Sequence, residues 1–239
     1  MRPKIICHMI GSIDGRLISN RWTPLPDSAG KKKVLEIYEE SAAKLGAQGW
    51  IVGRKTMAEM VRGAEHASKT SSQATARTSH MGNRQQRNLA ITIDPSGKLH
   101  YGVDHIGKEH LVTVLGSRVS EDYLAELRAD GVSYLFAGDD GHDLATAMGC
   151  ISADFQTECL LLEGGGTING AFLKADLIDE ISLLVYPGID GLAGIPSIFD
   201  YQGKDANERP ASGRRLRLMS VETLEAEVVW MRYRVERQQ

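Results

Sequence analysis

The stretch of this chain best suited to chemistry runs from residue 160 to residue 170, with the sequence LLLEGGGTING. An apolar strand is expected to end at Glu163, and three glycines then lead into an amphipathic helix beginning near Thr167. Glycine lets the backbone approach a ligand closely, and the first turn of a helix offers N–H groups and a positive dipole end to an anion. We therefore predict a phosphate-binding turn with a carboxylate beside it. An ordinary strand-to-helix connection without a ligand has the same composition, and Gly170 falls one position too late for a G-x-G-x-x-G dinucleotide fingerprint.

A second cluster of the same kind follows the apolar run at residues 50–52. It consists of Gly53, Arg54, Lys55 and Thr56. Arginine supplies a forked donor, lysine a point charge, and threonine a hydroxyl at the start of a helix, so this turn is suited to a 2′-phosphate or a pyrophosphate. A solvated helix start is the alternative. Two such turns in one chain favour a dinucleotide ligand.

The elements that must position these turns alternate between strand and helix. We expect strands at residues 5–10, 50–52, 88–93, 110–115, 132–136, 159–162 and 178–186, and helices at residues 31–45, 57–61, 121–129, 143–155 and 168–175. A hairpin is expected at residues 214–223 and 227–235. This order predicts an α/β fold with three α-β-α layers, a mostly parallel sheet and antiparallel C-terminal edge strands.

Composition narrows the class of protein. The chain has 239 residues, of which 42% are hydrophobic, so it can bury the core of a single domain over residues 1–239. A net charge of −3 argues against a nucleic-acid surface, and no run approaches the ~20 apolar residues of a membrane helix. Cys7, Cys150 and Cys159 form no C-x-x-C pair, so we expect reduced thiols, a cytoplasmic protein and no metal site.

Three further segments are interpreted from their composition. Residues 62–87 are basic and nearly without apolar side chains, which predicts a mobile basic loop, either a lid or a disordered segment. The apolar runs at residues 181–186 and 228–233 are expected at an open sheet edge, which favours a homodimer. His8 on the first strand is interpreted as a packed core histidine, since no second His or Cys stands at ligand spacing.

Three motifs in order carry a family resemblance. Ser12-x-Asp14-Gly15 follows the first strand, IVGRKT occupies residues 51–56, and LEGG-x-T occupies residues 162–167. Together they resemble the reductase domain of the bifunctional riboflavin biosynthesis deaminase-reductases, which belong to the dihydrofolate reductase-like superfamily. The resemblance covers most of the chain and extends through residues 173–188. The zinc-binding deaminase domain of those proteins has no counterpart here, so the resemblance implies reduction alone.

The resemblance implies NADPH as the cofactor. The residues then expected to hold its phosphates are Gly53, Arg54, Lys55, Thr56, Gly164, Gly165, Gly166 and Thr167. It also implies that Ser12, Asp14 and Glu163 lie towards the nicotinamide and the substrate. We expect Glu163, beside bound phosphates, to favour its protonated form and relay a proton, and Asp14 to bind substrate hydroxyls. Trp22 is a candidate ligand-facing aromatic, with a packed loop anchor as the alternative.

The small-molecule substrate implied by the resemblance is a ribosylamino-pyrimidine phosphate, which would be reduced to its ribitylamino form. A dihydrofolate, pterin or other imine reductase of the same fold is one alternative, and a non-catalytic nucleotide-binding protein is another. Folate is disfavoured because three lysines occupy residues 31–33, where an apolar pterin-binding helix face is expected. The insertion at residues 62–87 is long for the family.

Overall fold

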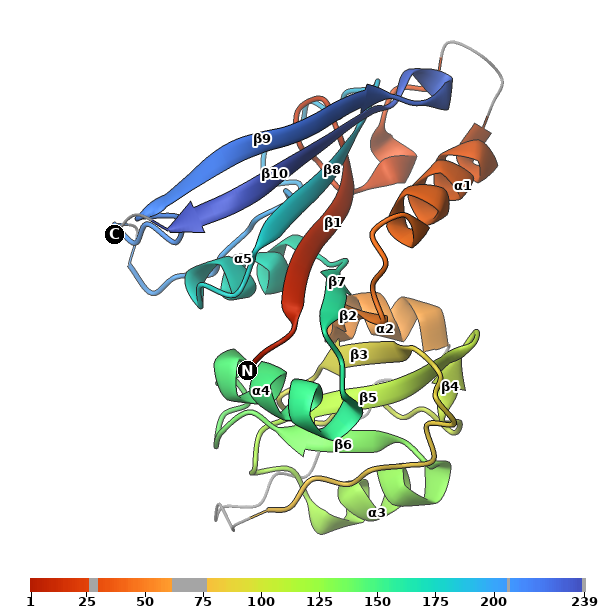
Figure 1. Cartoon of the computed structure of the whole chain (residues 1–239), viewed down its shortest axis with the longest axis vertical. Coiled ribbons are helices and arrows are strands. Elements are labelled where there is room, and N and C mark those ends of the chain that lie inside the picture. The colour runs from red at the N-terminus through yellow and green to blue at the C-terminus, as the bar shows by residue number, and fades with distance from the viewer. Residues whose placement is uncertain (26–29, 62–76, 206, 238–239) are drawn as a thin grey trace. The chain divides into compact units, whose positions relative to one another are not determined.

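The structure is a computed structural model that describes residues 1–25, 30–61, 77–205 and 207–237 (Figure 1). It contains two compact units. The first unit comprises Met1–Pro3 and Gln48–Leu160, and the second comprises Lys4–Ala47 and Leu161–Gln239. Strand β7 (Cys159–Leu162) carries the chain from the first unit into the second. Across the described ranges, no helix combines the length and apolar character that crossing a membrane requires.

The first unit is built from strand-turn-helix repeats, as the sequence predicts. Its strands are β2 (Gly49–Gly53), β3 (Leu89–Ile93), β4 (His105–Ile106), β5 (Glu109–Leu115) and β6 (Ser133–Phe136). Its helices are α2 (Arg54–Val61), α3 (Glu121–Asp130) and α4 (Leu144–Phe155). Strands β2, β3, β5 and β6 pair in parallel, while β4 pairs antiparallel with β5. The sequence did not predict β4, because two residues are too few to show a periodic pattern.

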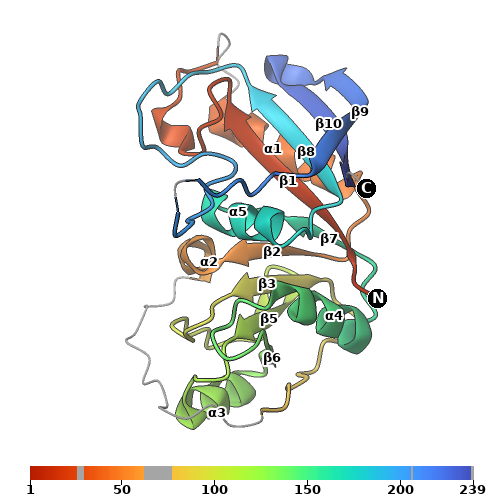
Figure 2. The ribbon, with the colours of Figure 1, turned by 90° about the vertical axis from the view of Figure 1, so that its left-hand side faces the viewer.

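The sheet of the first unit is covered on both faces. Every residue of β3 is buried, and Ala90 joins a cluster with Met57 of α2 and Leu127 of α3. Leu89 and Ile91 alternate with Ala90 and so point to the opposite face. Helix α4 lies on the opposite side of this sheet from α2 and α3 (Figure 2). A parallel sheet buried between two helical layers is the arrangement expected from its apolar strands.

The second unit contains β1 (Lys4–Ser12), β8 (Glu180–Tyr186), β9 (Arg214–Thr223) and β10 (Val229–Arg237), with helices α1 (Gly30–Ala43) and α5 (Gly166–Lys174). Two short 3₁₀ turns, η1 (Ser19–Arg21) and η2 (Glu225–Glu227), complete it. Strand β1 pairs in parallel with β8, whereas β10 pairs antiparallel with both β8 and β9. The α/β class and the antiparallel C-terminal strands are therefore confirmed.

The open sheet edge expected at residues 181–186 and 228–233 is not found there. Residues 181–186 lie in β8, between β1 and β10, and residues 229–233 lie in β10, between β8 and β9. The edge strand of this unit is β9 instead. Its sequence mixes arginines with apolar residues, so periodicity alone did not show that it is outermost.

The predicted basic loop at residues 62–87 is described only from residue 77 onward, and residues 62–76 lie outside the described part. The arginines that follow contact the protein. Arg77 donates to the carbonyls of Ser117 and Val119, and Arg87 donates to Asp104 at 2.6 Å. These contacts attach residues 77–87 to the first unit, while the mobility of the rest of the loop stays a prediction.

Candidate active site

The turn after β1 is organised by Ser12 and Asp14. The Ser12 hydroxyl is buried, donates to Asp14 Oδ1 at 2.6 Å, and accepts the backbone N–H of Arg16 at 2.9 Å. The Ser12 hydrogen bond is the main reason that the pKa of Asp14 falls to about 2. Asp14 is therefore ionised at neutral pH, which suits an acceptor for substrate hydroxyls.

Asp14 also binds a loop that the sequence did not single out. Its carboxylate accepts the backbone N–H groups of Asp190, at 3.1 Å, and Gly191, at 2.9 Å, in the segment that follows β8. Arg21 in turn pairs with Asp190 at 2.8 Å. We call residues 187–201 the β8 loop. Only the hydrogen bonds of the folded chain reveal that Asp14 holds it, since the residues are 176 and 177 positions apart.

The β8 loop continues to the start of α5. The backbone of Leu17 donates to the carbonyl of Pro196 at 3.0 Å, and Asn169 Nδ2 donates to the carbonyl of Ile198 at 2.9 Å. A Cβ added at Gly166 would meet the Ser197 carbonyl oxygen at 2.1 Å. The loop therefore joins the Ser12 turn to the glycine turn, and the glycine at position 166 is required by packing against it.

Gly164 leaves space beside the start of α5. Gly164 has φ of +131°, which glycine adopts readily, and an added Cβ there would meet none of the described atoms within 4 Å. The helix begins at Gly166, slightly earlier than expected, and its N-cap, Gly165, has no side chain to satisfy the first N–H groups. This geometry fits an anionic phosphate held by backbone N–H groups.

Glu163 lies beside this turn and near Tyr38 of helix α1. Burial, and after it the nearby charge of Glu163, raises the pKa of Tyr38 well above its ordinary value. The Tyr38 hydroxyl donates to the carbonyl oxygen of His8 at 3.1 Å. The sequence did not show that Tyr38 is near Glu163, because one tyrosine in an amphipathic helix carries no signal beyond that of a core residue.

His8 is a buried structural histidine, as predicted. Its Nδ1 lies 2.9 Å from Ser182 Oγ, and Trp230 Nε1 donates to the same oxygen at 2.8 Å. Because Ser182 receives the indole hydrogen, its own hydroxyl hydrogen can point to a neutral His8. Burial lowers the pKa of His8 to about 4, so the ring is neutral at physiological pH.

Trp22 packs against the aromatic residue opposite Ser12. Its ring centroid lies 4.9 Å from that of Tyr186, with the planes tilted by 37°. Tyr186 pairs with Ser12 in the β1–β8 register. Trp22 Nε1 is buried and has no hydrogen-bond partner within the described chain. The structure thus shows the packing expected of a loop anchor, and a ligand-facing role for Trp22 stays a prediction.

The second predicted phosphate turn belongs to the first unit. Helix α2 begins at Arg54, so Arg54, Lys55 and Thr56 form its first turn. Arg54 Nε lies 3.8 Å from Oδ1 of Asp94, whose side chain is only 1% exposed. The other Asp94 oxygen accepts backbone N–H groups at 2.6 and 3.0 Å. Arg54 therefore compensates a buried carboxylate, whereas Lys55 is exposed.

The pairing of Asp94 with Arg54 could not be inferred from their spacing in the sequence. As for metals, the residues that the structure describes contain no group of three His, Cys, Asp or Glu side chains placed to hold an ion.

Comparison with known proteins gives one family and several similar folds. Residues 3–230 match the model of the RibD C-terminal domain. Curated proteins provide no match. A pyrimidine reductase-like protein from Corynebacterium diphtheriae superposes with a TM-score of 0.65 at 17% identity, covering 99% of this chain and 93% of that one.

Two further solved structures have a similar fold. RibD from Acinetobacter baumannii superposes with a TM-score of 0.60 at 20% identity. The match covers 98% of this chain and 58% of the RibD chain. The riboflavin biosynthesis reductase Rib7 of Saccharomyces cerevisiae gives 0.57 at 13% identity, covering 98% of this chain and 90% of that chain. These likenesses confirm the expected dihydrofolate reductase-like fold class.

Proposed function

Because the chain belongs to the RibD C-terminal domain family, we propose that it is an NADPH-dependent reductase of a ribosylamino-pyrimidine phosphate. The observation that carries the proposal is the glycine turn at the start of α5, whose N-cap has no side chain and which Glu163 directly precedes. Solved proteins with this fold include a pyrimidine reductase-like protein and a riboflavin biosynthesis reductase. The proposed product is the ribitylamino compound, formed by reduction at C1 of the ribose.

We propose that backbone N–H groups of Gly164, Gly165, Gly166 and Thr167 bind a cofactor phosphate, and that Gly53, Arg54, Lys55 and Thr56 supply the other phosphate contacts. Helix N-termini of this kind bind phosphate through aligned N–H groups and the helix dipole. Of the two cations, Lys55 is the better candidate for a 2′-phosphate, since Arg54 already faces Asp94. The cofactor would supply a hydride.

The proposed substrate site uses Ser12, Asp14, Trp22 and Glu163. A glycosylamine opens to an imine, whose C1 takes the hydride while its nitrogen takes up a proton. In this proposal the Asp14 carboxylate orients ribose hydroxyls, and the Glu163 carboxyl donates the proton. Alignment of the reacting atoms at roughly 3–3.5 Å and exclusion of water would supply most of the rate enhancement.

The test is NADPH oxidation followed by absorbance with two substrates, the ribosylamino-pyrimidine phosphate and dihydrofolate. We expect turnover of the first and none of the second. Turnover of dihydrofolate alone would support the pterin reductase alternative. Saturable NADPH binding without turnover of either compound, or of any other imine tried, would favour a non-catalytic nucleotide-binding protein.

We also propose a homodimer, on the evidence of one face of the β8–β10–β9 strands. Residues directly opposite in an antiparallel pair share a face, and this face carries Leu218 opposite Tyr233, and Val221 opposite Met231. Leu218 and Val221 are each 54% exposed. A bulge between Leu218 and Ser220 keeps both side chains on the same side.

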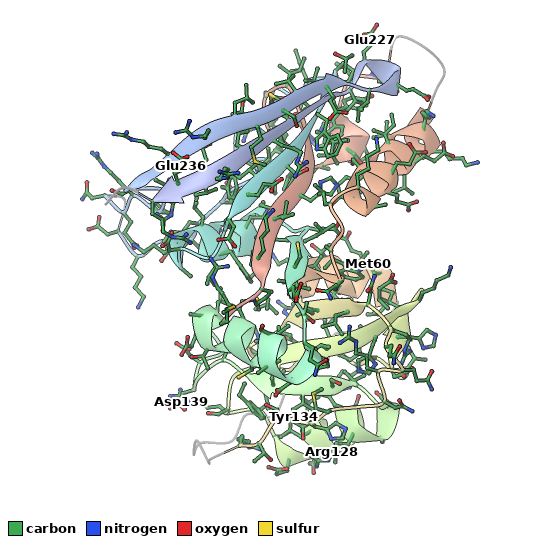
Figure 3. All side chains as sticks on the ribbon, in the orientation of Figure 1. Met60, Arg128, Tyr134, Asp139, Glu227 and Glu236 are labelled. Carbon is green, nitrogen blue, oxygen red and sulfur yellow. The ribbon has the colours of Figure 1, made fainter. Side chains whose placement is uncertain are left out.

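Both ends of this hairpin carry acidic side chains. Glu227 lies at the turn end, and Glu236 lies towards the other end (Figure 3), where it pairs with Arg217. A two-fold axis through the apolar face would bury this face against the same face of a second copy. Sedimentation should show a dimer for the parent and a monomer for Leu218→Asp. A monomeric parent at micromolar concentration would contradict the proposal.

A further inference from the structure

We propose that residues 77–87 form a strap that closes the free edge of β6 and prevents two copies of the chain from pairing through that edge. Strand β6 pairs with β5, and no other strand that the structure describes pairs with it. The strap passes beside β6 (Figure 1), where His80 forms an antiparallel bridge with Tyr134. Proteins commonly cover such an edge with a loop, because its exposed backbone groups can otherwise pair with another chain.

The bridge occupies both backbone groups of Tyr134 that point away from β5. The His80 N–H donates to the Tyr134 carbonyl at 2.9 Å, and the Tyr134 N–H donates to the His80 carbonyl at 3.0 Å. The two rings also lie together, with their centroids 5.5 Å apart. In a strand of four residues, alternate positions direct their backbone groups to the same side, so Tyr134 shares this edge with Phe136. The strap therefore covers one of the two residues at which a second chain could pair.

Gly82 fixes the strap close to the start of β6. Its N–H donates to Ser133 Oγ at 2.9 Å, and the same oxygen lies 2.7 Å from Nε2 of the buried His110 on β5. A Cβ added at Gly82 would meet the Gly131 carbonyl oxygen at 2.1 Å. Any side chain at position 82 would therefore push the strap away from β6, so one small substitution can loosen it.

Arginines hold the strap on either side of the bridge. Arg77, whose side chain is only 7% exposed, donates to two carbonyls of the β5–α3 connection. Arg84 donates to the carbonyl of Phe155, the last residue of α4, and its guanidinium carbon lies 5.9 Å from the centroid of that ring. Arg87 pairs with Asp104 at 2.6 Å. These contacts reach three different parts of the first unit, so the strap is held along its length and not at the bridge alone.

The test is hydrogen exchange and sedimentation of Gly82→Ala, made in the Leu218→Asp background so that the proposed dimer face does not contribute. We expect the Tyr134 amide to exchange about tenfold faster than in the background protein, while the amides of the wholly buried β3 keep their rates. The sedimenting mass should rise with protein concentration, because the released edge pairs with a second copy. The matched control is Gly149→Ala on α4, where an added Cβ meets none of the described atoms within 4 Å, and both readouts should stay unchanged.

Three results would overturn the inference. The first is a Gly82→Ala protein whose Tyr134 amide is released while its mass stays that of the background protein, since the edge would then need no cover. The second is a Tyr134 amide that exchanges in the background protein as fast as in an unfolded chain. The third is association accompanied by loss of protection in β3, which would indicate unfolding instead of edge pairing.

A second variant keeps the test decisive if Gly82→Ala does not fold. His80→Pro removes the N–H that donates to the Tyr134 carbonyl and leaves position 82 unchanged. It should also release the Tyr134 amide and raise the sedimenting mass with concentration. A folded His80→Pro protein that sediments like the background protein, with its Tyr134 amide released, would contradict the shielding role. The outcome does not depend on the proposed reductase function.

Discussion

The two glycine-containing turns that the sequence predicts as phosphate sites differ in how the structure uses their residues. At the start of α5 the turn consists of glycines, which have no side chains. Its third glycine, Gly166, is needed for packing against the Ser197 carbonyl. At the start of α2 the first cation, Arg54, faces the buried Asp94. Similar motifs thus have different structural roles, and substitutions can separate these roles from the proposed phosphate binding.

The largest effect on stability is expected at the glycine turn of α5. Gly166→Ala would place a Cβ 2.1 Å from the Ser197 oxygen and force the β8 loop away from α5. We expect a loss of about 2–4 kcal/mol in the free energy of unfolding. At position 164 an alanine Cβ would have space. Gly164→Ala should therefore lower the free energy of unfolding by only about 1–2 kcal/mol, because alanine adopts a positive φ poorly. Urea denaturation compares them, and equal losses would contradict the packing role assigned to Gly166.

At the α2 turn, Arg54→Ala should destabilise the fold although the site is partly exposed. The change leaves the Asp94 carboxylate buried without its nearest cation, at a cost of about 1–3 kcal/mol once the exposure of Arg54 is allowed for. Lys55→Ala, the neighbouring control, should stay within about 0.5 kcal/mol of the parent. A fully stable Arg54→Ala variant would show that the ion pair is unimportant.

Removing Lys55 tests the proposed contact with the 2′-phosphate of NADPH. Because Lys55 is exposed, its removal should weaken NADPH binding about tenfold by deleting one charge-assisted phosphate contact, while NADH binding stays unchanged. Titration calorimetry with both nucleotides measures this. Equal loss for NADPH and NADH would place Lys55 away from the 2′-phosphate, and no loss for either would remove it from the cofactor site.

The smallest effect concerns the Ser12 turn, which the β8 loop joins to α5. The pKa of Asp14 is lowered from 3.8 to about 2, so its stabilising contribution is present above pH 4 and is lost as the pH falls towards 2. The Tm of the parent should therefore exceed that of Asp14→Asn at pH 5, and the difference should shrink between pH 4 and 2. A difference independent of pH would show that the charge of Asp14 contributes nothing.

The sequence predicted local features well, because strands and helices show their periodicity within a few residues. The strand before Glu163, the helix after β2 and the hairpin of β9 and β10 were all found this way, although α2 begins at Arg54, three residues before the expected start. Contacts made across long stretches of chain were not found. The Arg54–Asp94 pair, the hydrogen bonds of Asp14 to the β8 loop and the edge position of β9 depend on tertiary pairing, which no local pattern encodes.

We propose that the start of α5 binds a phosphate of NADPH, and an NMR titration of the ¹⁵N-labelled protein tests this most directly. We predict that NADPH shifts the amide signals of Gly164, Gly165, Gly166 and Thr167 saturably, and that adenosine, which lacks phosphate, leaves them unchanged. Saturable NADPH binding that moves other amides but not these four would contradict the account.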